Sequence, residues 1–185
     1  MTSAPIGRPR SEEARRAILL AARDLIAAEG YDAVTMVQIA TTARVGRQTI
    51  YRWWPTKEAV VADAVLSHAL PVDLVLAQPT GDLRHDLLLW ADRSAHVMAG
   101  PGSAPMFRAL LAAAALDERA ARRMQEDLAE PLRVALRAAF AAAARPDPAD
   151  AAADVLLGAL LHDLLVRATA TLPSLRSAID LVTRD

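Results

Sequence analysis

One stretch of the chain, residues 35–59, decides the fold and reads TMVQIATTARVGRQTIYRWWPTKEA. Thr35 and Gln38 have the spacing of a capping box, in which side chain and backbone satisfy each other's free groups where a helix begins. We therefore expect one short helix from Met36. A second short helix should follow residues 44–46, with Ile50 and Trp54 four residues apart on its apolar face. The stretch thus predicts a helix-turn-helix.

The second helix of a helix-turn-helix enters the major groove of DNA. If Ile50 and Trp54 point inward, the polar residues around them project outward, where glutamine suits adenine edges and arginine suits guanine. The residues expected to face the bases are Arg47, Gln48, Thr49 and Arg52. Tyr51 and Lys57 are expected to grip phosphates, and the N–H groups that follow Thr56 offer a further anion site.

Residues 44–59, RVGRQTIYRWWPTKEA, resemble the signature of the tetracycline-repressor (TetR) family, and the resemblance covers residues 11–60 in register. It implies a homodimer with an N-terminal three-helix DNA-binding domain and a larger helical domain that binds a small inducer. The positions that the resemblance assigns to DNA contact are Thr35, Arg47, Gln48, Thr49, Tyr51 and Lys57. Arg44 and Gly46 depart from the family pattern, because they replace a turn glycine and a serine cap.

Trp53 and Trp54 stand where relatives commonly carry a His-Phe pair. We expect Trp54 in the core and Trp53 near the DNA backbone, with the exchanged assignment left open.

A short basic segment, Gly7-Arg8-Pro9-Arg10, precedes the first expected helix, which should begin at Ser11. Arginine arms of this kind reach into a narrow, electronegative minor groove, so Arg8 and Arg10 are candidate DNA contacts. The alternative is a solvated N-terminus without a role in binding.

Helical spacing of apolar residues continues through the chain. The first helix should begin at Ser11 and stop at a left-handed Gly30. The further helices expected are one from Thr56 towards Leu70, Leu83–Met98, Met106–Ala115, Glu118–Ala144 with a kink or break at Pro131, Ala149–Ala170, and a last one after Ser174. The pattern predicts an all-α protein. We expect a helix-turn-helix DNA-binding domain over residues 1–55 and a helical ligand-binding and dimerisation domain over residues 56–185.

Composition excludes several classes of protein. The 185 residues include no cysteine, so disulfides, thiolate nucleophiles and cysteine-bound zinc are absent. No stretch approaches the roughly 18 apolar residues of a membrane span, and no signal-peptide pattern is present, so we expect a cytoplasmic protein without a membrane partner. Net charge is −1, but residues 44–57 hold four cations and no acid, which suits a phosphate surface.

The histidines are scattered, without the i, i+4 pairing of a helical metal site; they are His68, His85, His96 and His162. No phosphate-binding loop, serine elbow or carboxylate pair appears either. We therefore expect no metal, no cofactor and no catalysis. A helical ligand-binding module without gene-regulatory activity is the alternative reading, ahead of an enzyme on a helical scaffold.

Two further sets of candidate residues lie after residue 80. An effector cavity, which should be mostly apolar with a few polar groups, has as its candidates Trp90, His96, Met98, Met106, Phe107, Met124 and His162. A subunit interface has as its candidates Leu157, Gly158, Leu161, Leu164, Leu165, Leu175 and Ile179, since family members dimerise through their final two long helices. Plain core packing is the alternative for the effector set.

Together these features predict a homodimeric transcriptional regulator, a repressor released from DNA by a small-molecule effector. Its two recognition helices should lie about 34–36 Å apart, one turn of DNA, on a pseudo-palindromic operator in double-stranded DNA.

Overall fold

The computed structural model describes residues 8–68, 78–99, 102–145, 147, 149–167 and 171–184. Every regular element in these ranges is a helix, which confirms the all-α fold. None of the described helices is long and apolar enough to cross a membrane. The helices form two compact units, which we describe one at a time.

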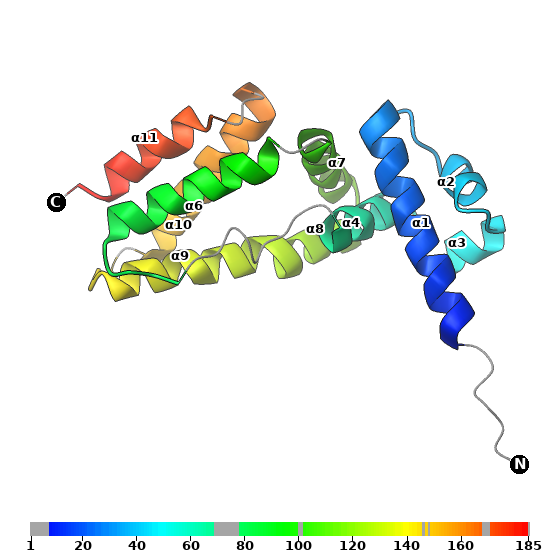
Figure 1. The fold of residues 1–185 in the computed structure, drawn as a ribbon, viewed down its shortest axis with the longest axis horizontal. Coiled ribbons are helices and arrows are strands. Elements are labelled where there is room, and N and C mark those ends of the chain that lie inside the picture. The colour runs from blue at the N-terminus through cyan, green and yellow to red at the C-terminus, as the bar shows by residue number, and fades with distance from the viewer. Residues whose placement is uncertain are drawn as a thin grey trace, which may run out of the picture. The chain divides into compact units, whose positions relative to one another are not determined.

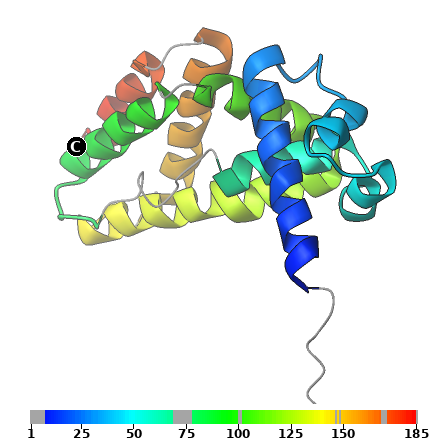
Figure 2. The ribbon, with the colours of Figure 1, turned by 45° about the vertical axis from the view of Figure 1, so that its right-hand side comes forward.

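Unit 1 is built around the first helix of the chain. It comprises α1 (Arg8–Glu29), α2 (Met36–Thr42), α3 (Arg47–Trp53), α4 (Lys57–His68), and nearly all of α7 (Ser103–Leu116) and α8 (Glu118–Met124). Helix α1 crosses α4 and also packs against α2 and α3 (Figures 1 and 2). Ile18 and Ile26 of α1 are fully buried, as are Ile39 of α2 and Ile50 of α3. Val61 of α4 is fully buried as well, so the four helices share one apolar core.

The ends of α1 differ in how well the sequence predicts them. The helix ends at Glu29, and Gly30 adopts the left-handed conformation that stops it, with φ +82°, as expected. It begins at Arg8 rather than at Ser11, so the proposed arm is in part the first turn of the helix. Proline is tolerated in a first turn, because its missing N–H has no helical partner there. The side chains of Arg8 and Arg10 lie outside the described residues.

Unit 2 contains the remaining helices. They are α6 (Leu83–Met98), the π-helical η1 (Gln125–Ala129), α9 (Glu130–Ala142), α10 (Ala149–His162), the π-helical η2 (Asp163–Arg167) and α11 (Pro173–Val182). Helices α6 and α10 each pack against both α9 and α11, so four helices enclose a second core (Figure 1). Leu87, Phe140, Leu156 and Ile179 supply one buried side chain from each of the four.

Pro131 divides the long helix expected over Glu118–Ala144, as predicted. The structure has α8, then one π-helical turn in η1, then α9 with Pro131 near its start. Proline cannot donate to the carbonyl four residues back, and its ring crowds that carbonyl. The wider turn relieves the conflict, because the Glu130 N–H donates to the Gln125 carbonyl, five residues back.

Helix α11 begins at Pro173, just before Ser174, and a residue from another helix caps it. Leu172 precedes the helix in a left-handed conformation, with φ +50°, and no side chain at that position caps α11. Asp163 of η2 does so instead, because its Oδ2 accepts a hydrogen bond from the Leu175 N–H at 2.9 Å. A carboxylate at a helix N-terminus is favourable, so the fully buried Asp163 has a structural role.

The two packing units do not coincide with the boundary expected between residues 55 and 56. Helices α4, α7 and α8 belong to the same compact unit as the first three helices. The expected division into residues 1–55 and 56–185 therefore remains a proposal about function.

Candidate nucleic-acid interface

The predicted helix-turn-helix is present as α2, a turn and α3. Thr35 caps α2 as expected, since its hydroxyl accepts from the Gln38 N–H at 3.2 Å and the Gln38 side chain accepts from the Thr35 N–H at 2.9 Å. Helix α2 ends in a Schellman arrangement, in which the N–H groups of Val45 and Arg44 donate to the carbonyls of Ala40 and Thr41. This turn holds α3 against α2.

Arg44 occupies the position in this turn that favours glycine. Its φ is +56°, a conformation that costs a residue with a Cβ about 1–2 kcal/mol. Gly46 precedes α3 and offers no side chain to cap it. Both departures from the family pattern therefore have a structural consequence, which is a strained turn at Arg44 and a helix α3 without a side-chain cap.

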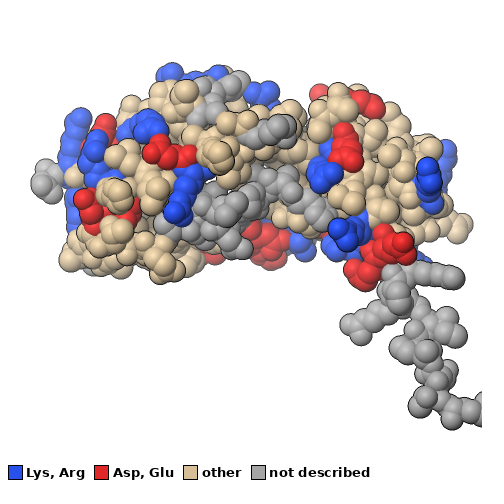
Figure 3. Space-filling model, in the orientation of Figure 1, with Lys and Arg blue, Asp and Glu red and all other residues tan. Residues whose placement is uncertain are grey.

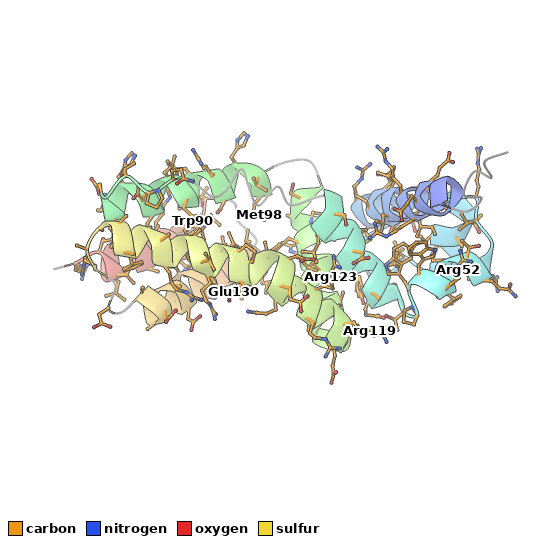
Figure 4. The ribbon with its side chains drawn as sticks, turned by 90° about the horizontal axis from the view of Figure 1, so that it is seen from below. Arg52, Trp90, Met98, Arg119, Arg123 and Glu130 are labelled. Atoms are coloured by element: carbon orange, nitrogen blue, oxygen red, sulfur yellow. The ribbon has the colours of Figure 1, made fainter. Side chains whose placement is uncertain are left out.

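Helix α3 has one buried face and one exposed face. Ile50 is fully buried, and Trp54, which follows the helix, is 4% exposed. The opposite face presents Arg47, Gln48, Tyr51 and Arg52, all exposed, while Thr49 is half-buried at the edge. Four of the residues predicted to face DNA are thus brought together on one surface. Figure 3 shows basic side chains over the end of unit 1 that carries α2 and α3, and Figure 4 labels Arg52 there.

The two tryptophans are placed as predicted where the structure tests them. Trp54 lies in the core and its Nε1 donates to Asp63 Oδ2 at 2.9 Å. Trp53 is half-buried beside it, with ring centroids 6.0 Å apart. The Trp53 Nε1 is buried without a hydrogen-bond partner among the described residues. A role for Trp53 at the DNA backbone remains a prediction.

Lys57, the only lysine in the sequence, has partners that the sequence did not reveal. Its Nζ donates to the Tyr31 carbonyl oxygen at 3.0 Å and lies 4.1 Å from the centroid of the Tyr31 ring. The Tyr31 hydroxyl in turn donates to Glu58 Oε1 at 2.9 Å. Burial, followed by the neighbouring Glu58 carboxylate, raises the pKa of Tyr31 well above its usual value.

Helix α4 begins as predicted. The Thr56 hydroxyl accepts a hydrogen bond from the Ala59 N–H at 3.2 Å, so Thr56 caps the helix. The same hydroxyl donates to Asp117 Oδ2 at 3.3 Å. The expected anion site at this N-terminus therefore has a carboxylate close to it.

Two segments of the chain match known families. Residues 77–182, more than half of the chain, match the family described as Tetracyclin repressor-like, C-terminal domain. Residues 18–64 match the family described as Bacterial regulatory proteins, tetR family. The chain belongs to the TetR family of regulatory proteins.

Individual proteins resemble the chain in sequence or in fold. The HTH-type transcriptional regulator YdeS of Bacillus subtilis is 37% identical over 128 residues, which is 69% of this chain and 63% of YdeS. The structure of NalD from Pseudomonas aeruginosa is 20% identical, with a TM-score of 0.64 over 92% of this chain and 95% of NalD. The multidrug binding protein EbrR is 22% identical, with a TM-score of 0.69 over 92% of this chain and 95% of EbrR. The last two share the TetR fold.

The residues expected to line an effector cavity of this TetR-family chain are distributed over both compact units. Trp90 and Met98 are buried on α6 in unit 2 (Figure 4), whereas Met106 and Phe107 are buried on α7 in unit 1. Met124, at the end of α8, is half-buried.

Two members of this set, His96 and His162, are exposed, because each lies on the side of its helix opposite the buried positions. A contact of either residue with an effector stays a prediction. Among the described residues, no group of three or more His, Asp or Glu side chains could hold a metal ion.

The residues expected at a subunit interface also divide. Gly158 and Leu165 are exposed, and Leu157 and Leu161 are half-buried, all on one side of α10 and η2. Leu164, Leu175 and Ile179 are instead buried within this chain, at 7%, 0% and 0% exposed. Packing inside unit 2 accounts for these three without a partner, so we remove them from the candidate interface.

Proposed function

We propose that this chain is a sequence-specific DNA-binding regulator of transcription that reads DNA with α3. The two-faced character of α3 carries the proposal. Its buried face anchors a helix of seven residues that would not be stable alone. Its exposed face presents Arg47, Gln48 and Arg52, and these side-chain types pair with guanine and adenine edges in the major groove.

Phosphate contacts would come from the edges of this surface, from Tyr51 on α3 and Lys57 at the start of α4. Lys57 is held by the Tyr31 carbonyl oxygen, which accepts one hydrogen bond. A lysine ammonium has three N–H donors, so Lys57 can keep this contact and still bind a phosphate oxygen. Thr35 is exposed at the start of α2, where its hydroxyl also holds the cap of that helix.

Dimerisation would use the exposed apolar side of α10 and η2, formed by Leu157, Gly158, Leu161 and Leu165. Gly158 supports this assignment. A glycine inside a helix costs about 0.5–1 kcal/mol relative to alanine. Apart from its neighbours in the helix, no described residue lies within 4 Å of a Cβ built at Gly158, so packing among the described residues does not explain the glycine. Close approach of a second copy does.

The regulated step would be release of a repressor from DNA by a small molecule. The likeness to NalD, described as the secondary repressor of the MexAB-OprM multidrug efflux pump, and to EbrR, described as a multidrug binding protein, supports this mode. Trp90 is 5% exposed, and its Nε1 has no hydrogen-bond partner among the described residues. An apolar ligand that carries an acceptor would satisfy this donor. A regulator of bacterial genes would act in the cytoplasm, where the DNA lies.

The experiment that tests DNA reading is selection from a random duplex library, followed by affinity measurements on the selected sequence. We expect Gln48→Ala to cost about 1–3 kcal/mol of discrimination at one base position. Lys57→Ala should weaken binding to all sequences by similar factors and reduce its salt dependence. Gln78→Ala, at an exposed position of unit 2, is the matched control. Equal selectivity of Gln48→Ala and the wild type would reject the assignment of α3.

A further inference from the structure

Asp63 on α4 joins three other segments of unit 1 through one carboxylate. Its Oδ2 accepts from Trp54 Nε1 at 2.9 Å and from Arg15 Nη2 on α1 at 3.3 Å. Its Oδ1 lies 3.5 Å from Arg123 Nη2 on α8. The Asp63 side chain is 16% exposed, so these contacts replace most of its hydration.

The contact with Trp54 fixes the end of the recognition helix. Trp54 directly follows α3, and its N–H donates to the Ile50 carbonyl, which closes the last turn. Arg15 also lies over the Trp54 ring, 5.9 Å from its centroid. Because the Trp54 ring is in the core, loss of the Asp63 carboxylate would leave its Nε1 with a buried, unsatisfied hydrogen.

The contact with Arg123 is a polar link between α4 and α8. A second link joins the caps of the two helices, since Thr56 caps α4 and donates to Asp117. Asp117 in turn caps α8, because its Oδ1 accepts from the N–H groups of Arg119 and Ala120. Thr56 and Asp63 are two helical turns apart on α4, while Asp117 and Arg123 stand at opposite ends of α8. Figure 4 shows Arg119 and Arg123 at these two ends, with Arg123 beside α4.

We propose that Asp63 is a positioning residue for DNA recognition. Through Trp54 and Arg123 it holds the end of α3 in a fixed position relative to α8. Exposed ion pairs contribute little to the free energy of folding. This link would instead affect specific DNA binding, because small displacements of the side chains that contact bases weaken that binding. Arg123 is followed at once by Met124 and η1, so the chain leads from this link into the helices of unit 2. The inference rests on the proposed function of α3.

Two substitutions remove the ion pair between Asp63 and Arg123, one at each residue. Asp63→Asn removes the charge but keeps the shape, and Arg123→Met removes the partner while leaving the contact between Asp63 and Trp54 in place. Arg123 is 46% exposed, so its variant should fold even if Asp63→Asn does not. The matched controls are Asp24→Asn and Arg23→Met, which break an exposed pair on α1 that contains the same two residue types.

The measurements are affinity for the selected operator and hydrogen exchange of the α3 amides in the full chain without DNA. We expect each link variant to weaken operator binding about threefold to tenfold and to speed α3 exchange. The double variant should lose no more than the larger single loss, because the same link is removed. Both controls should match the wild type in both measurements.

The proposal would be overturned if Arg123→Met bound the operator as tightly as the wild type, whether or not α3 exchange changed. The proposal would also be overturned if the loss of operator affinity in the double variant equalled the product of the two single losses, because the two residues would then act independently. Failure of the proposed function gives a different result, in which the wild-type protein itself shows no sequence preference.

Discussion

Arg44 and Ala144 hold the same backbone conformation at the ends of two different helices. Both have φ +56°, and both lie in Schellman arrangements, after α2 and α9 respectively. Glycine adopts this conformation without strain, whereas a Cβ makes it costly. Arg44 is exposed and belongs to the basic stretch 44–57, whereas Ala144 carries no charge and lies in unit 2. Substitutions at the two positions therefore distinguish the effect of backbone strain from the effect of a cation near the DNA.

Replacing either residue with glycine should raise the free energy of unfolding, by about 0.5–1 kcal/mol, because relief of strain outweighs the greater freedom of the unfolded chain. Urea denaturation measures this gain. Arg44→Gly should also weaken DNA binding and its salt dependence, since one cation is lost. Ala144→Gly should leave DNA binding unchanged, and a stability loss in both variants would contradict the description of these turns.

Tyr31 gives the protein a specific sensitivity to alkaline pH. Burial and the Glu58 carboxylate raise its pKa in the folded state above the unfolded value of 10.0. The folded state therefore holds the phenolic proton more tightly, and stability falls as the pH rises above about 10. Tyr31→Phe should reduce this alkaline loss when unfolding is followed against pH. Tyr51→Phe, which changes the exposed second tyrosine, is the control and should retain the alkaline loss of stability.

At the scale of helices, local signals made the helix-turn-helix predictable. The capping box at Thr35, the interval of residues 44–46 and the spacing of Ile50 and Trp54 all act within a few residues of one another. The Leu83–Met98 helix was also predicted with both ends correct. In the structure Asp82 caps it, because its Oδ1 accepts from the His85 N–H only three residues away. Elements that close their hydrogen bonds locally are readable from the sequence.

Contacts between residues far apart in the chain were not predictable. No local pattern connects Asp63 with Arg123, Lys57 with the Tyr31 carbonyl oxygen, or Asp163 with the start of α11. The exposure of His162 was not predicted, because α10 is apolar over so much of its surface that the sequence alone does not identify the inward side. His96 is exposed because it lies opposite the buried positions of α6.

The exposed side of α10 and η2 carries a prediction about assembly. Leu165→Asp should place a charge in the proposed dimer interface and yield a monomer by light scattering, because an unpaired charge cannot be buried cheaply. Leu116→Asp makes the same change at an exposed leucine of unit 1 and should leave the dimer intact. If the Leu165→Asp variant remained a dimer, the assignment of η2 to the interface would be contradicted.

Gly158→Ala tests the same interface with effects of opposite sign. The alanine should stabilise α10 within one chain by about 0.5–1 kcal/mol, while its methyl group obstructs the close approach of a second copy. We therefore expect a more stable chain that dimerises less tightly.

At the scale of the whole molecule, a homodimer would carry two copies of α3 to two half-sites. The two-fold symmetry of the protein would then appear in the DNA as a pseudo-palindrome, with half-sites about 34–36 Å or one helical turn apart, or a modestly larger spacing. Binding of a small molecule would release the DNA only to the extent that it favours a different spacing of the two recognition helices.

Selection of fragments from the genomic DNA of the source organism by the purified protein tests the central claim most directly, with a salt titration on the fragment that binds best. We expect enrichment of one short palindrome, bound with an affinity that falls steeply as salt rises. Weak binding without sequence preference would contradict it, and would favour a helical ligand-binding module that has kept the fold without regulating genes.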